Sequence, residues 1–218
     1  MRFLRTIVSG WNKPRIDLRS PLTFRNAFLF PLQCPGAVWG VLVGGFLLLI
    51  PVLGFALNMG CRLRMVGRMQ RGLSPWPCWR EPLILWRKGL LATVTIVGYH
   101  LPALAVLALA LLLRRLDLLL LALSFGMAAT FLLPGFMTFY AHDGKVEHLK
   151  RPDRALFRVL KGGRLYLKAW GIGIVACLLS FTGLLFFGVG FAWTSVWFWR
   201  VAAFCFSRVF SEQYDLLT

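Results

Sequence analysis

The residue types best suited to chemistry gather in one short stretch, His142-Asp143-Gly144-Lys145-Val146-Glu147-His148. Its imidazoles and carboxylates could bind a metal ion or move protons at a membrane surface. The structural alternative is a solvated turn, in which Gly144 breaks a helix that ends at Ala141 and a new helix begins near Pro152. We expect the turn, because a catalytic site needs polar groups that converge, and the 8 Asp and Glu residues all lie at or outside the ends of the apolar segments.

Standard catalytic motifs are missing from the sequence. It has no Gly-x-Ser-x-Gly, no P-loop and no His-Glu-x-x-His. The five cysteines contain no Cys-x-x-Cys pair and are odd in number, which signals neither a disulfide framework nor a zinc site, so we interpret them as small apolar packing residues. They are Cys34, Cys61, Cys78, Cys177 and Cys205. We therefore expect no enzyme activity, no catalytic or metal-binding residue and no cofactor.

Two polar side chains fall within apolar runs, His100 and Arg200. An ion-coupled transporter is expected to carry an Asp, a Glu or a paired base along its path. We interpret His100 as a hydrogen-bonded core residue rather than a proton relay. Arg200 follows three tryptophans, so we expect it to contact an aromatic ring or a lipid headgroup and to snorkel toward the membrane surface, unless the helix register places it deep.

The elements that position these residues are membrane helices. Hydrophobic residues make up 58% of the chain, charged residues 15%, and the mean hydropathy is +0.70, which is too apolar for a hydrated surface. Uncharged runs reach the roughly 20 residues that a spanning helix needs. These runs are Asn26 to Cys61, Gly89 to Leu113, Leu118 to Ala141 and Ala169 to Trp199.

The second and third of these runs predict a helical hairpin. Leu90 to Leu113 and Leu116 to Ala141 are separated only by Arg114 and Arg115, so the two helices must be antiparallel neighbours. The last run is too long for one perpendicular span, and its glycines near 183–190 favour a turn between two short crossings. A single tilted span followed by a tryptophan-rich surface helix is the competing interpretation.

The first run, Gly36 to Leu57, is divided by Pro51, and the distribution of charge decides how we interpret it. If the chain enters the membrane and returns near Pro51, all Lys and Arg residues except Arg114 and Arg115 lie on one side, as the positive-inside tendency requires. We therefore predict an all-α integral membrane protein of three helical hairpins, the first of which either crosses the membrane or is re-entrant. It would lie in the cytoplasmic (inner) membrane as a multi-pass protein with both termini cytoplasmic.

Glycines in the first run predict close helix packing. Gly36, Gly40 and Gly44 recur every four residues and share one helix face, where another backbone could approach. The partner would be the return arm of the same hairpin or a second copy of the chain. We favour packing within the chain.

Interfacial amphipathic helices are expected at two places. From Pro152 to Lys168, Arg154, Arg158, Lys161 and Arg164 alternate with apolar residues in helical register, which predicts a helix attracted to anionic lipid. Near the N-terminus, Phe3, Leu4, Ile7, Val8 and Trp11 also have helical spacing, and a disordered basic tail is the alternative. We divide the chain into a basic amphipathic segment (1–34), a membrane domain (35–210) and a tail (211–218).

Several of these stretches occur together in one known family. They are Gly44 to Pro51, leading to Gly60 and an Arg-rich helix that ends at Arg71-Gly72; Pro75-Trp76 and Trp79; and Leu133-Pro134 through Phe139-Tyr140-Ala141, then Gly144. Over roughly Pro35 to Phe210 the chain resembles the bacterial and archaeal membrane family catalogued as domain of unknown function 4013. Acidic residues often found near the Arg-rich segment of that family are absent here. The resemblance implies a helical membrane architecture and no particular reaction.

These observations favour a non-enzymatic membrane protein, an accessory, scaffold or assembly subunit that contacts anionic lipid and a larger membrane complex or a second copy of itself. A transporter or permease-like subunit acting as an oligomer is the alternative. An interfacial lipid-modifying enzyme that uses His142 to His148 ranks third. Nucleic acid is not an expected partner, because the basic residues are scattered along segments next to the membrane rather than gathered in a binding domain.

Overall fold

The computed structural model describes residues 16–215, and every regular element in that range is a helix. In chain order the elements are α2 (Phe24–Leu29), η1 (Phe30–Leu32), α3 (Pro35–Leu48), α4 (Pro51–Gln70), α5 (Pro82–Leu113), α6 (Leu116–Asp143), α7 (Glu147–Lys150), α8 (Pro152–Ser180), η2 (Phe181–Leu185) and α9 (Phe191–Gln213). The all-helical class is therefore confirmed. The helix expected between Phe3 and Trp11 lies outside the described residues.

Three described helices are long and apolar enough to cross a membrane: Pro82–Leu113, Leu116–Asp143 and Pro152–Leu185. A fourth span exists if Phe24–Leu32 and Pro35–Leu48, which are bent by 76° relative to each other, count as one. Length and composition are thus those of a multi-pass membrane protein.

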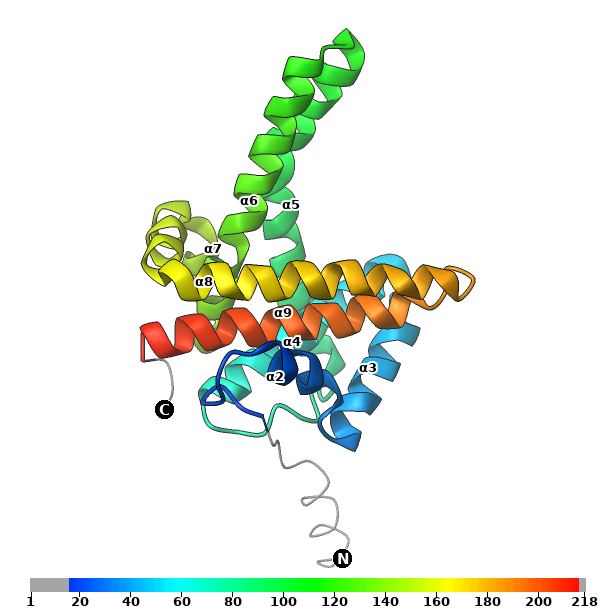
Figure 1. The fold of residues 1–218 in the computed structure, drawn as a ribbon, viewed down its shortest axis with the longest axis vertical. Coiled ribbons are helices and arrows are strands. Elements are labelled where there is room, and N and C mark those ends of the chain that lie inside the picture. The colour runs from blue at the N-terminus through cyan, green and yellow to red at the C-terminus, as the bar shows by residue number, and fades with distance from the viewer. Residues whose placement is uncertain (1–15, 216–218) are drawn as a thin grey trace, which may run out of the picture.

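Helices α5 and α6 lie side by side and extend far beyond the rest of the molecule (Figure 1). α5 begins at Pro82, whose missing N–H would be unpaired at a helix start anyway. It ends at Arg114 in the left-handed conformation (φ 51°), and α6 starts after the extended Arg115, so the chain reverses abruptly. The predicted pairing of these two helices is present in the structure.

Helices α8 and α9 form another side-by-side pair, which runs across the α5–α6 pair (Figure 1). The chain reverses through η2 and the left-handed Gly188 (φ 74°), within the glycine-containing stretch where the turn is predicted. α8 packs along α9, and α9 lies on α3 and α4. The expectation of three hairpins that each cross the membrane stays a prediction.

A kink divides α8. Gly163 has non-helical angles (φ 51°, ψ −137°), so 152–162 forms a short helix that is followed by a long one. The sequence predicts a weak helix end at Gly162 and Gly163, and the kink lies there.

The first apolar run is also divided as predicted. α3 ends at Leu48, Ile50 is extended (φ −102°, ψ 94°), and α4 begins at Pro51. The two helices contact each other, and α4 continues through the Arg-rich segment to Gln70.

The core is built around α9 and includes part of the N-terminal segment. Phe30 stacks on Phe204 of α9 with ring centroids 4.8 Å apart, and Leu18 and Ala27 are buried in the same core. The described part of segment 1–34 therefore packs directly against the membrane domain.

Helices α4 and α5 approach each other closely at two glycines, Gly60 and Gly89. A Cβ atom on Gly60 would overlap the carbonyl of Leu85, and a Cβ on Gly89 would overlap the carbonyl of Ala56. Each helix thus offers a glycine to the backbone of the other, which is how helices approach closely in membrane proteins.

The predicted glycine row packs within the chain. Gly40 and Gly44 are buried, and a Cβ there would meet side chains of Arg200, Asn58 and Val196 from α4 and α9. Gly36 is only partly buried.

The interpretation of all cysteines as packing residues is wrong for one pair. Cys61 of α4 and Cys78 form a disulfide that joins α4 to the segment before α5, with Cα atoms 5.2 Å apart. The two residues are 17 positions apart, and only the fold of the intervening segment brings them together. Cys34 and Cys205 are free and buried, as packing residues would be.

Candidate functional site

The cluster from His142 to His148 forms a hydrogen-bonded turn. Asp143 is the last residue of α6, and Gly144 follows in the left-handed conformation (φ 73°). One Asp143 oxygen accepts the Lys145 backbone N–H at 2.9 Å, and the other lies 2.9 Å from Nε2 of His148.

The contact with Arg158 indicates which tautomer the neutral His148 ring adopts. Its Nη2 lies 3.1 Å from Nδ1 of His148. A guanidinium can only donate, so Nδ1 accepts and Nε2 carries the proton that faces Asp143. Both ring nitrogens are then occupied, and the imidazole has no free lone pair for a metal or a substrate proton. No group of His, Cys, Asp and Glu that could hold a metal ion occurs within 16–215.

Arg158 was expected at the lipid surface and is instead buried, with 8% of its surface exposed. Its guanidinium lies 3.4 Å from the centre of the Phe139 ring and donates to the Gly135 carbonyl at 3.1 Å. The reason is helical register: Ala155, Arg158, Val159 and Gly162 form one buried face on the short helix 152–162.

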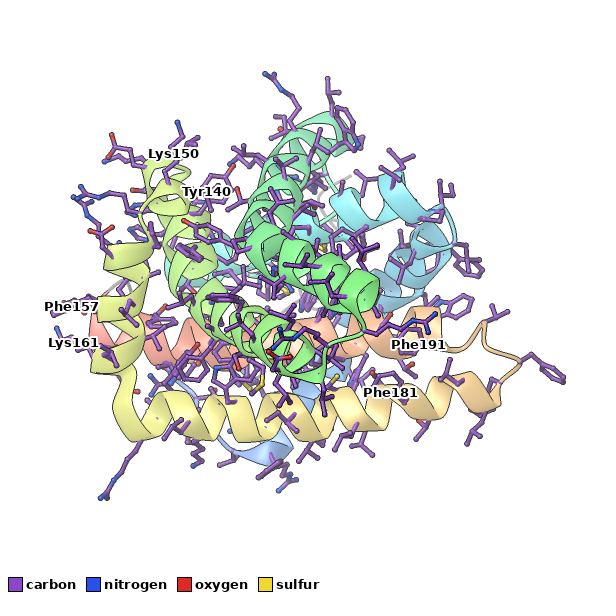
Figure 2. All side chains as sticks on the ribbon, turned by 90° about the horizontal axis from the view of Figure 1, so that it is seen from above. Tyr140, Lys150, Phe157, Lys161, Phe181 and Phe191 are labelled. Atoms are coloured by element: carbon purple, nitrogen blue, oxygen red, sulfur yellow. A yellow bond between two sulfur atoms is a disulfide. The ribbon has the colours of Figure 1, made fainter. Side chains whose placement is uncertain are left out.

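The other three basic residues of that prediction, Arg154, Lys161 and Arg164, are exposed. Apolar residues between them are also exposed, and Leu160 shows 70% of its surface. Phe157 and Lys161 project away from the bundle on the same side (Figure 2). The helix thus offers apolar and cationic side chains to one exterior surface, which is the composition of interfacial helices.

Arg200 is more deeply buried than expected, with 3% of its surface exposed, so it does not snorkel. It donates to the Ala37 carbonyl at 3.1 Å and lies 4.8 Å from the centre of the Trp76 ring. The predicted contact with an aromatic ring is present, although with Trp76 rather than with the tryptophans of its own helix. Gly40 leaves the space for the guanidinium on α3.

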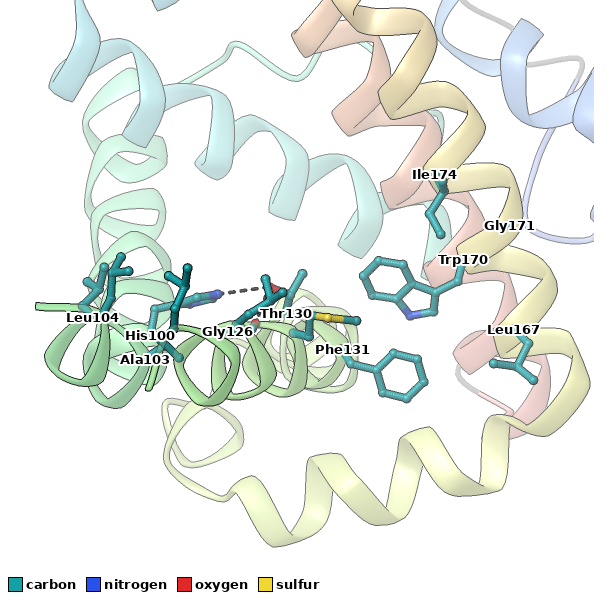
Figure 3. Close-up of a pocket in the computed structure, with 15 residues that line it drawn as sticks. His100, Ala103, Leu104, Gly126, Thr130, Phe131, Leu167, Trp170, Gly171 and Ile174 are labelled. Atoms are coloured by element: carbon teal, nitrogen blue, oxygen red, sulfur yellow. Dashed lines mark hydrogen bonds between the residues drawn. The ribbon is translucent and has the colours of Figure 1, made fainter. Parts of the chain in front are cut away.

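A long apolar groove lies where the α5–α6 pair meets α8. Its volume is about 850 Å³. Figure 3 shows His100 and Thr130 on one wall and Trp170, Gly171 and Ile174 on the other. His100 hydrogen-bonds to the Ile96 carbonyl at 2.8 Å and to the Thr130 hydroxyl at 3.1 Å, so it is paired as predicted, but it lines a groove rather than a core.

A smaller cavity of about 290 Å³ adjoins this groove, and Thr130 and Trp170 line both. It lies among α4, α6 and α9, and its wall includes Arg62. The guanidinium of Arg62 contacts the Met59 sulfur at 2.8 Å and lies 5.8 Å from the Trp199 ring centre. One signal in the sequence marks this residue, since Arg62 is the first charge after a long uncharged run.

No family model, no curated protein and no solved structure matches this chain. The resemblance to the family of unknown function therefore stays a prediction.

Proposed function

We propose that this chain is a non-enzymatic, multi-pass membrane protein that acts as an accessory, scaffold or assembly subunit and binds anionic lipid. The observation that carries the proposal is the exposed surface of α5 and α6. Only 11% of the most apolar window of each helix is buried, so these helices require lipid or a protein partner around them. The occupied ring of His148 further favours binding over catalysis.

We place the α5–α6 pair across the membrane, with Arg114 and Arg115 on the far side. The remaining Lys and Arg residues would lie on the cytoplasmic side together with both termini. The α8–α9 pair, whose turn exposes Phe186 and Phe187, would then rest in the near leaflet instead of crossing. A larger membrane complex or a second copy would contact the same apolar surfaces.

The Cys61–Cys78 disulfide favours the opposite orientation, in which Cys78 and the loop around it face away from the cytoplasm. The reason is that disulfides persist in oxidising compartments. Cysteine labelling in intact cells decides between the two. With Cys177 replaced by Ala, a membrane-impermeant maleimide should label Leu116→Cys and should not label Leu73→Cys or Val146→Cys, all of which are exposed positions. Labelling of Leu73→Cys and Val146→Cys but not of Leu116→Cys would show that the orientation is the opposite of the proposed one.

Lipid binding by the helix 152–162 is tested by hydrogen exchange of the full chain in nanodiscs. Replacing Arg154, Lys161 and Arg164 by Gln should weaken protection of its amides in anionic nanodiscs by up to about 3 kcal/mol, at about 1 kcal/mol per basic residue. The loss should shrink at high salt, because screening acts over about 10 Å at 0.1 M. The control is the same pair of proteins in zwitterionic nanodiscs, where protection should be equal. An equal difference in both lipids would assign these charges to a contact within the protein.

A further inference from the structure

Arg62 is a cation in an apolar cavity with no carboxylate to pair with. No ion pair of Arg62 occurs among the described residues, and its contacts are the Met59 sulfur and the Trp199 ring. Arg158 and Arg200 also lie over aromatic rings, but each in addition donates to a backbone carbonyl. Arg62 is half-buried, and a cation partly withdrawn from water is stabilised by charge-assisted hydrogen bonds, which these contacts do not supply.

The cavity at Arg62 lies beside a second space. It shares the lining residues Thr130 and Trp170 with the groove between α5–α6 and α8, whose walls are almost entirely apolar (Figure 3). The two spaces therefore lie next to each other, one with a cation in its wall and the other with an apolar, hydrocarbon-like wall. A free inorganic anion would use only the first space, whereas an amphiphile would use both.

We propose that the two spaces together form a binding site for one anionic phospholipid, with its phosphate at Arg62 and an acyl chain in the groove. Thr138 and Ser207 also line the cavity. The proposal rests on the membrane placement given above, but not on the helix 152–162, whose exposed basic residues belong to a different surface. In this proposal the phospholipid is bound at a specific site of the protein and is distinct from the bulk membrane lipid around the helices.

The test is photocrosslinking of the full chain in detergent micelles. The probe is a phosphatidylglycerol with a diazirine on its acyl chain, and the matched neutral probe is a diacylglycerol with the same chain. Peptides of α6 and α8 that line the groove should be labelled by the phosphatidylglycerol at low probe concentration. Arg62→Gln should weaken this labelling about tenfold, which is the usual effect of losing one charge-assisted hydrogen bond. Arg62→Lys keeps the charge and should restore part of it.

A second variant tests the apolar groove, where the acyl chain is proposed to bind. Gly171 lines the groove, and a Cβ there would meet nothing within 4 Å, so Gly171→Phe fills the groove without a clash at the backbone. It should abolish labelling of the groove. Matched controls are Gly98→Phe, at an exposed glycine outside the groove with equally open space, and Arg87→Gln, an exposed arginine outside the cavity. Both should label like the unaltered protein.

Several outcomes would overturn the proposal. They are equal labelling of the groove by the neutral probe, unchanged labelling in Arg62→Gln, or complete competition by millimolar inorganic phosphate, which would make the site one for a free anion. Absence of labelling on the outer faces of α5 and α6 as well would instead contradict the membrane placement. Thermal unfolding of each variant shows whether a loss of labelling comes from loss of the fold.

Discussion

Replacing Gly89 by Ala should destabilise the protein by about 3 kcal/mol or more, the upper end of the usual cost of overpacking. A single methyl group at this position would overlap the Ala56 carbonyl, and the neighbouring contact, Gly60 against Leu85, is as close. Backbone atoms cannot rotate away as side chains do, so α4 and α5 would have to separate. Fluorescence-detected unfolding in mild detergent, as a function of denaturant, measures the change.

Gly98→Ala is the matched control for this substitution. Gly98 lies on the same helix, is exposed, and has nothing within 4 Å of a Cβ. Alanine should stabilise α5 there by up to about 1 kcal/mol, since glycine is the poorer helix former. If Gly89→Ala and Gly98→Ala had the same small effect, the close α4–α5 contact would not exist in the folded protein.

Replacing Arg200 by Ala should cost about 3 kcal/mol, within the range for truncating a large buried side chain. The substitution leaves a cavity beside Gly40 and removes the donor to the Ala37 carbonyl and the cation from the Trp76 ring. Arg200→Met should cost much less, about 1 kcal/mol. It fills most of the space, and it removes a buried charge that no carboxylate within residues 16–215 compensates.

The comparison of these two variants separates packing from charge. Both are measured by denaturant unfolding in the same detergent, and Arg87→Gln serves as a surface control that should have no effect. If Arg200→Met were as destabilising as Arg200→Ala, the positive charge itself would hold α9 to α3. If neither variant were destabilising, Arg200 would not be buried against Ala37 and Trp76.

Arginines that lie over aromatic rings are a recurring feature of the fold, and composition explains why these arginines contact rings rather than carboxylates. The chain has 25 Lys and Arg residues and 8 Asp and Glu residues, so acidic partners are scarce, while tryptophan and phenylalanine are abundant. Arg62, Arg158 and Arg200 each lie near an aromatic ring. The quadrupole of a ring stabilises a cation without requiring a second buried charge.

The sequence by itself determined the helical class, the pairing of α5 with α6, and the break at Pro51. These features depend on local signals: long uncharged runs, a two-residue connection at Arg114-Arg115, and a proline that cannot continue a helix. The paired state of His100 was also predictable, because a lone polar group among apolar residues must find a hydrogen-bond partner. So was the turn at Asp143-Gly144, where a glycine ends a helix.

The tertiary structure alone decided which side chains face inward and how the helix pairs cross. Arg154 and Arg158 look alike in the sequence, yet only Arg158 falls on the buried face of its helix. There its guanidinium contacts Phe139 of α6 and His148 of α7. Hydrophobic periodicity cannot distinguish the inside of a bundle from a lipid-facing surface, because both are apolar. For the same reason the crossing of α8–α9 over α5–α6, the Gly60–Gly89 contact and the cavity at Arg62 depend on long-range packing that no local pattern encodes.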